Sequence, residues 1–128
     1  MAVAVDTSVL ARYFTKDDSE LYTKASSLLK AAKSNSVVLD RVVVAELGYV
    51  LKSVYGLDKD QVVAVYKALL ANNIFSVPDR ELLELTIDLF DIEKPLSFED
   101  CWMLSLKHYG KVTEVLTFDT GLIKRVGL

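Results

Sequence analysis

The stretch Ala2-Val3-Ala4-Val5, followed by Asp6, Thr7 and Ser8, decides the fold of this chain. Four consecutive apolar residues with β-branched side chains at alternate positions are typical of a short strand covered on both faces of a parallel sheet. We expect this strand to be the first along the chain and central in the sheet. Asp6 then stands at the carboxyl end of the strand, where open α/β sheets place ligand-binding and catalytic groups.

The rest of the chain alternates between strand-like and helix-like segments, which is typical of βαβ units around a parallel sheet. Further strands are predicted at 36–39, 75–78 and 112–118. Helices are predicted from Thr7 to about Phe14 and at 19–33, 41–55, 59–71, 79–92, 98–109 and 120–126. The alternation predicts an α/β fold. No repeat or low-complexity stretch divides the 128 residues, so we expect a single domain, 1–128.

The composition excludes several classes of protein. With 52% hydrophobic and 26% charged residues, the chain is too apolar to be disordered. No apolar run approaches the roughly 20 residues of a membrane-spanning helix, and the N-terminus lacks a secretory leader, so we expect a soluble, cytoplasmic protein. One cysteine, Cys101, and one histidine, His108, cannot build a Cys/His zinc site. Any bound metal must therefore be held by oxygen atoms.

The charge balance argues against a protein that coats DNA through a broad basic face. The net charge is −3 and the isoelectric point is near 5.1, whereas generic nucleic-acid affinity comes from clustered cations. A nuclease is still compatible with this balance, because acidic residues around a metal would themselves lower the isoelectric point. A local phosphate-binding rim could be formed by Arg12, Lys16, Arg41, Lys52 and Lys107.

Four acidic residues stand out by their positions: Asp6, Glu46, Asp100 and Asp119. Asp119 closes the apolar run 115–118, as Asp6 closes the first strand, and the other two lie on predicted helices. Carboxylates brought together raise one another's pKa unless a cation neutralises them. Oxygen ligands of this kind suit Mg²⁺ or Mn²⁺. The working hypothesis is a metal-dependent phosphodiester hydrolase.

Each carboxylate also has a purely structural interpretation. Asp6 and Asp119 could cap the helices that follow them. Asp100 falls at the third position of a helix capped by Ser97, where the helix dipole and free backbone N–H groups stabilise a carboxylate. Glu46 is predicted to fall within the apolar stripe of its helix, and burial there would require a metal or a salt bridge to Arg12 or Arg41.

The remaining polar and aromatic residues carry weaker signals. His108 lies about 12 Å along its helix from the helix N-terminus, so we interpret it as a partner of the C-terminal helix dipole. Cys101 and Trp102 are interpreted as core or interface residues. The tyrosines, with Tyr49, Tyr55 and Tyr66 among them, are spaced as helix-packing groups rather than as a base-stacking ladder.

Four short motifs, in this order and spacing, resemble those of PIN-domain proteins, and in particular the small VapC-type toxins. They are Val5-Asp6-Thr7-Ser8-Val9-Leu10, Val44-Ala45-Glu46-Leu47, Leu96-Ser97-Phe98-Glu99-Asp100 and Leu116-Thr117-Phe118-Asp119. The resemblance spans essentially the whole chain. It implies a three-layer α/β/α sandwich around a parallel sheet in the order 3-2-1-4-5.

The same resemblance implies an Mg²⁺- or Mn²⁺-dependent RNA endonuclease. By carry-over, the metal ligands would be Asp6, Glu46, Asp100 and Asp119. Ser8, where many family members carry Asn, and Thr117 would supply orienting hydroxyls, and Glu99 would be a neighbour of the site. Water attack would leave a 3′-hydroxyl and a 5′-phosphate. The resemblance further implies an antitoxin partner of the VapB kind and a homodimer.

Two other interpretations remain open at this point. One is a catalytically silent interaction module with PIN-like architecture, against which the complete set of four carboxylates argues. The other is a receiver-type phosphoacceptor domain. Such receivers usually pair two acidic residues after the first strand and place a lysine after the last one. Here Asp6 is followed by Thr7 and Ser8, and the last predicted strand ends in Asp119.

Overall fold

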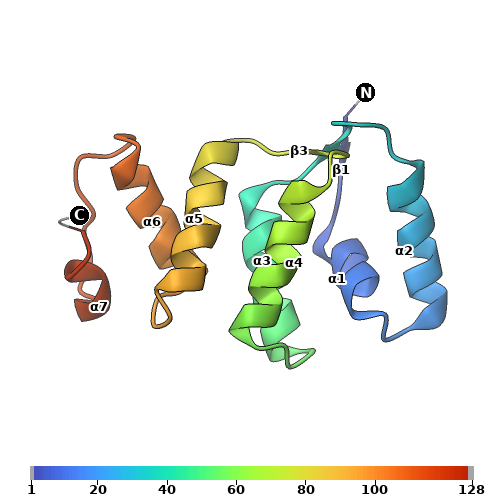
Figure 1. Cartoon of the computed structure of the whole chain (residues 1–128), viewed down its shortest axis with the longest axis horizontal. Coiled ribbons are helices and arrows are strands. Elements are labelled where there is room, and N and C mark those ends of the chain that lie inside the picture. Colours follow the sequence, from blue (N-terminus) through green and yellow to red (C-terminus); the bar gives the residue numbers. More distant parts are fainter. Residues whose placement is uncertain (1, 127–128) are drawn as a thin grey trace. The chain divides into compact units, whose positions relative to one another are not determined.

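The computed structural model describes residues 2–126. The chain forms two compact units, Met1–Pro78 and Asp79–Leu128, and each is described by itself (Figure 1). Unit 1 combines a parallel sheet with four helices, and unit 2 consists of three helices and their connections. Two of the four carboxylates singled out in the sequence belong to each unit.

The sheet of unit 1 consists of β1 (Val3–Ala4), β2 (Val37–Val38) and β3 (Phe75–Ser76). The strands are parallel and follow the order β1-β2-β3, with Val3 opposite Val37 and Val37 opposite Phe75. The helices of unit 1 are α1 (Thr7–Thr15), α2 (Ser19–Ala31), α3 (Arg41–Ser53) and α4 (Lys59–Ala71). α1 packs against α2 and α3, and α3 packs against α4.

A close helix–helix approach organises the core of unit 1. Tyr66 of α4 is 1% exposed, and its hydroxyl donates a hydrogen bond to the carbonyl of Val44 on α3 (3.0 Å). Gly48 makes room for this ring, because a Cβ atom there would lie 1.9 Å from the Tyr66 hydroxyl oxygen. A buried tyrosine needs such a partner for its hydroxyl. The contact therefore fixes which face of α3 points inward.

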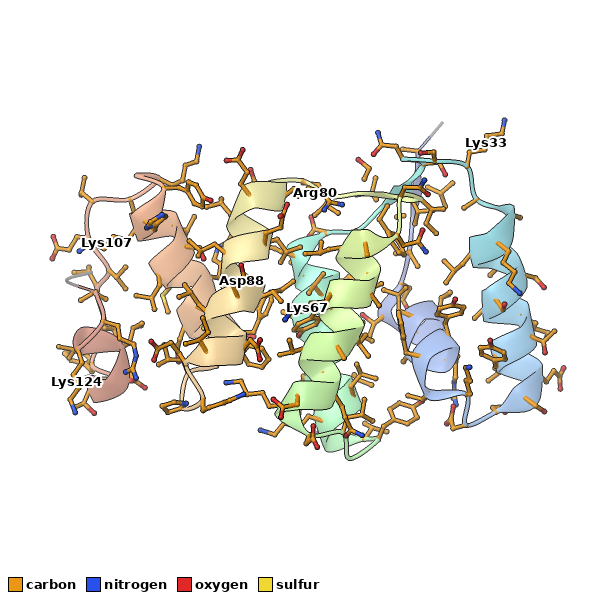
Figure 2. All side chains as sticks on the ribbon, in the orientation of Figure 1. Lys33, Lys67, Arg80, Asp88, Lys107 and Lys124 are labelled. Atoms are coloured by element: carbon orange, nitrogen blue, oxygen red, sulfur yellow. The ribbon has the colours of Figure 1, made fainter. Side chains whose placement is uncertain are left out.

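Unit 2 contains α5 (Arg80–Ile92), α6 (Phe98–His108) and α7 (Thr120–Ile123). α5, which carries Arg80 and Asp88, lies beside α6, which carries Lys107 (Figure 2). The interface between these two helices buries Thr86 and Ser105 completely. Their hydroxyl oxygens lie 3.0 Å apart, and each also lies within hydrogen-bond distance of a backbone carbonyl of its own helix. The pair keeps two buried polar groups satisfied, as packed interiors require.

The local predictions of secondary structure are largely confirmed. The seven predicted helices and the first three predicted strands are all present, with ends that differ by no more than a few residues. Asp58 and Gln61 form a capping box at the start of α4. These features depend on neighbouring residues along the chain, which is why the sequence predicts them well.

The predicted strand at 112–118 is wrong. These residues belong to no strand or helix, and no backbone hydrogen bond joins them to a described strand. Leu116 is 85% exposed and Phe118 is fully exposed. A run of β-branched and aromatic residues favours a strand only where a neighbouring strand pairs with it. Within the described residues the sheet therefore has the first part of the predicted order, 3-2-1, and no strand follows β3.

No helix in residues 2–126 combines the length and the apolar character needed to cross a membrane.

Candidate metal centre

Asp6 stands two residues after β1 and caps α1. The prediction that this first strand is central is wrong for the described residues, because β1 is an edge strand of the three-stranded sheet and β2 is its middle strand. The Oδ2 atom of Asp6 accepts hydrogen bonds from the Ser8 hydroxyl (2.6 Å) and from the Ser8 backbone N–H (3.1 Å). These two hydrogen bonds, the hydroxyl first, lower the pKa of Asp6 below its ordinary value. Because both bonds fall on Oδ2, Oδ1 keeps lone pairs for another ligand. The structural role of Asp6 as a helix cap is confirmed, and it leaves half of the carboxylate available.

Glu46 occupies a different environment from the one predicted. The buried face of α3 consists of Val44, Leu47, Gly48 and Leu51, and Glu46 lies on the exposed side. The sequence predicted a buried stripe of Val43, Leu47, Val50, Leu51 and Val54. Leu47 and Leu51 are buried as predicted, but Val54 is 70% exposed, so the buried face is rotated from the predicted one. The inference that Glu46 must be buried is therefore wrong.

The structural alternative for Glu46, a salt bridge to Arg12 or Arg41, is also absent among the described residues. Arg12 instead pairs with Asp17 at 2.9 Å, and no ion pair or hydrogen bond holds the Glu46 carboxylate within the described part of the chain. Both of its oxygen atoms are consequently available to a ligand. An exposed carboxylate needs neither a metal nor a salt bridge for the stability of the fold. The burial argument for a metal-binding role of Glu46 therefore no longer holds, and the role depends on the carboxylate being a suitable metal ligand.

Asp100 belongs to the capping box at the start of α6. The Ser97 hydroxyl accepts a hydrogen bond from the Asp100 backbone N–H (3.1 Å), and Asp100 Oδ2 accepts one from the Ser97 N–H (3.2 Å). Glu99 precedes it in the same helical turn. The structural interpretation of Asp100 is confirmed, and only one of its two oxygens takes part in the cap.

Asp119 caps the short helix α7. Its Oδ1 atom accepts a hydrogen bond from the Leu122 N–H (2.9 Å), while its own N–H donates to the Thr117 hydroxyl oxygen (3.0 Å). Gly121 lies beside this carboxylate, since a Cβ atom there would be 3.1 Å from Asp119 Oδ1. Thr117 thus holds the backbone of Asp119, much as Ser8 holds the side chain of Asp6.

Each unit supplies half of the predicted metal ligands. Unit 1 carries Asp6 and Glu46, and unit 2 carries Asp100 and Asp119. Among the described residues of either unit, no three His, Cys, Asp or Glu side chains lie together as a metal site. The donor set nevertheless fits a hard cation, because each of the four carboxylates keeps at least one oxygen outside its helix cap.

Asp40 is a carboxylate at the sheet edge that the sequence analysis did not single out. It follows β2 as Asp6 follows β1, and its Oδ1 atom caps α3 through the Val42 N–H (2.9 Å). The signal was present, because Asp40 closes the apolar run 37–39. Thr7, next to Asp6, also has an unusual environment: its Oγ1 atom is buried without a hydrogen-bond partner among the described residues.

The tyrosines, interpreted together as packing groups, fall into different environments. Tyr66 is buried, as expected of a packing residue, but Tyr49 is 72% exposed, so the packing interpretation is wrong for Tyr49. Among the cations considered for a phosphate rim, Arg12 is paired with Asp17, and the Lys16 amine lies 5.2 Å from the centroid of the Tyr22 ring. These two side chains already have partners within unit 1.

Two interpretations of unit 2 residues are consistent with the structure. His108 lies in the last turn of α6, where a cation complements the helix dipole. Cys101 is completely buried.

The family model described as PIN domain matches residues 3–128, nearly the whole chain. No curated protein matches.

Proposed function

The chain belongs to the PIN domain family, and from this premise we propose that it is an Mg²⁺- or Mn²⁺-dependent endoribonuclease. PIN domains have a three-layer α/β/α fold, with which the helices and the parallel sheet described above agree. They are generally metal-dependent nucleases that act on RNA or DNA. The observation that carries the proposal is the match over residues 3–128, because it includes all four carboxylates.

The proposed metal ligands are Asp6, Glu46, Asp100 and Asp119. Support comes from the different roles of the two oxygens in three of these carboxylates. One oxygen of Asp6, of Asp100 and of Asp119 accepts a hydrogen bond in a helix cap, which fixes the side chain. The other oxygen is left for a cation. Glu46 is held by no described residue, so both of its oxygens are available to a cation.

The chemistry assigns a role to each group. A bound divalent cation supplies charge neutralisation and Lewis-acid polarisation of a phosphodiester. Ser8 orients the Asp6 carboxylate and lowers its pKa, which keeps it ionised. Thr117 holds the backbone of Asp119. No Ser–His or Cys–His pair is available as a nucleophile, so water attacks phosphorus and the bond to the 3′ oxygen breaks. The products are a 3′-hydroxyl and a 5′-phosphate.

We further propose a biological role as the toxin of a toxin–antitoxin pair of the VapBC kind, acting in the cytoplasm as a homodimer. A nuclease of this size that cleaves cellular RNA requires an inhibitor, and a short antitoxin could cover the carboxylates. A neighbouring small open reading frame and co-purification of its product would support the toxin role. A gene without such a neighbour would favour a housekeeping nuclease.

The direct experiment incubates a panel of structured and single-stranded RNAs with the protein in Mg²⁺, Mn²⁺ or EDTA. Cleavage is expected with either ion and not with EDTA, and the new ends should be 3′-hydroxyl and 5′-phosphate. Detection of a 2′,3′-cyclic phosphate would contradict water attack. Absence of cleavage under all conditions would favour a silent interaction module of the same fold.

Ion binding provides an independent readout that does not require the correct RNA. An ion that binds only the folded protein stabilises it by mass action, by about 2.7 kcal/mol at a concentration of 100 times Kd. Mg²⁺ or Mn²⁺ should therefore raise the melting temperature of the wild type. The increase in melting temperature should be smaller in Asp6→Asn. Ca²⁺ serves as a control, because an ion that raises the melting temperature without supporting cleavage reports binding alone.

A further inference from the structure

One face of α3 is exposed along its whole length and contains the proposed ligand Glu46. This outer stripe consists of Val42, Glu46, Tyr49 and Ser53, spaced four, three and four residues apart. At 100° per residue these four side chains fall within about 60° of one another. Val42 is 65% exposed and Tyr49 is 72% exposed. Two large apolar groups thus flank a carboxylate on the side of α3 that faces away from the core of unit 1.

The environment of Tyr49 shows that its ring lies largely outside the packed core of unit 1. Val44, Leu47, Gly48 and Leu51 form the buried face, and Tyr66 reaches the backbone of α3 from α4 on that side. No described residue stacks on the Tyr49 ring. The Ser53 hydroxyl donates to the Tyr49 carbonyl (2.7 Å), a bond that involves only the backbone of Tyr49. The ring is therefore largely exposed on unit 1 and stacks on no described aromatic ring.

Helical geometry places this exposed ring one turn from Glu46. Residues three apart on a helix are separated by about 4.5 Å along the axis, and their Cβ atoms lie about 5–6 Å apart. Lys52 lies a further turn along, and it is exposed. A carboxylate, an aromatic ring and a cation therefore follow one another at intervals of three residues along the exposed side of α3.

We propose that Tyr49 is a substrate-binding residue that stacks on an unpaired base next to the scissile phosphate, with Lys52 on a neighbouring phosphate. The inference rests on the proposed ribonuclease function and assigns a residue that would hold the RNA next to Glu46. Bases in a duplex are already stacked on both faces, so an aromatic side chain binds only bases that are splayed out. Stacking on an aromatic ring is tolerant of sequence and adds affinity for each base.

The test measures RNA binding by Asp6→Asn, in which cleavage is expected to be lost, with Tyr49→Ala, Tyr49→Phe or Tyr49→Trp added. The probes are fluorescein-labelled 12-mers of oligoadenylate, oligouridylate and an abasic ribose-phosphate chain in Mg²⁺. Tyr49→Ala should weaken oligoadenylate binding about 5- to 150-fold. Tyr49→Phe and Tyr49→Trp should retain it, because their rings still stack. The abasic probe should bind all variants alike, which a general loss of structure would not produce.

Tyr109→Ala is the matched control, because Tyr109 is also exposed but belongs to unit 2 and lies beside His108. It should bind oligoadenylate as the parent does. The proposal is overturned if Tyr49→Ala binds oligoadenylate normally, or if it loses the abasic probe to the same extent. It is also overturned if the variant changes the sedimentation of the protein without changing RNA affinity, since Tyr49 would then contact a protein.

Failure of the ribonuclease proposal is recognised separately, because it concerns the wild type. A wild type that neither binds nor cleaves any RNA refutes the proposed function before a variant is made, and the assignment of Tyr49 falls with it. A wild type that cleaves RNA with an unchanged KM in Tyr49→Ala refutes only the stacking role. Stacking predicts a raised KM in this variant and a much smaller change in kcat.

Discussion

Asp6 and Asp40 occupy equivalent positions on neighbouring parallel strands. Ala4 pairs with Val38, and each aspartate stands two residues further along. Each caps the helix that follows, Asp6 through the Ser8 N–H and Asp40 through the Val42 N–H. The difference between them is chemical: a hydroxyl also binds the carboxylate of Asp6, and Asp6 alone belongs to the proposed set of metal ligands.

This equivalence provides a matched pair of substitutions. Asp6→Asn and Asp40→Asn both keep a residue that caps helices well, so neither should change the melting temperature appreciably. RNA cleavage in Mg²⁺ should be lost in Asp6→Asn and retained in Asp40→Asn. Equal loss in both would add Asp40 to the site, and normal cleavage by Asp6→Asn would remove Asp6 from it.

Glu46→Gln should abolish cleavage without affecting folding. The side chain is exposed and has no ion pair among the described residues, so the free energy of unfolding should change by no more than about 0.5 kcal/mol. A buried salt bridge would instead cost about 3–5 kcal/mol when one partner is removed. Urea denaturation in EDTA distinguishes the two cases. Glu84→Gln, on an exposed face of α5 and weakly paired with Arg80, is a control for the loss of one surface charge.

Ser8→Ala should raise the pKa of Asp6 toward its ordinary value, because the hydroxyl is the largest cause of its lowering. A depressed carboxyl pKa stabilises the fold above the unfolded value, about 3.9, and this stabilisation is lost as the pH falls through the lower, folded value. The variant should therefore lose less stability between these two points than the wild type does. The Asp6 carboxyl carbon, followed by NMR titration, reports the shift. Ser19→Ala, at the first position of α2, should leave the pKa of Asp6 unchanged.

Gly48→Ala should destabilise unit 1 strongly, since the new Cβ atom would lie 1.9 Å from the Tyr66 hydroxyl oxygen and 3.0 Å from the ring carbon that carries it. Overpacking of this kind costs about 1–3 kcal/mol. Tyr66→Phe removes the oxygen but also the hydrogen bond to Val44, so alone it should destabilise moderately. The double variant should be more stable than the sum of the two losses predicts. Strict additivity in thermal or urea denaturation would show that the two residues do not interact.

The sequence by itself determined the local features of the chain. Helix starts such as Asp58 with Gln61 and Ser97 with Asp100 depend on side chains three residues apart. The first three strands are short apolar runs that the alternation predicts, whereas their order in the sheet was implied by the resemblance to PIN domains. Three of the four candidate carboxylates, Asp6, Asp100 and Asp119, also stand at helix starts, so their helix caps could be predicted.

The tertiary structure alone decided which faces are buried and which segments find a partner. The apolar residues of α3 extend over more of its circumference than one stripe, and only the contact between Gly48 and Tyr66 selects the inward face. That choice leaves Glu46 and Tyr49 exposed. Likewise, residues 112–118 have the composition of a strand but pair with no described strand. Burial and sheet pairing depend on residues far apart in sequence, and composition and periodicity do not contain that information.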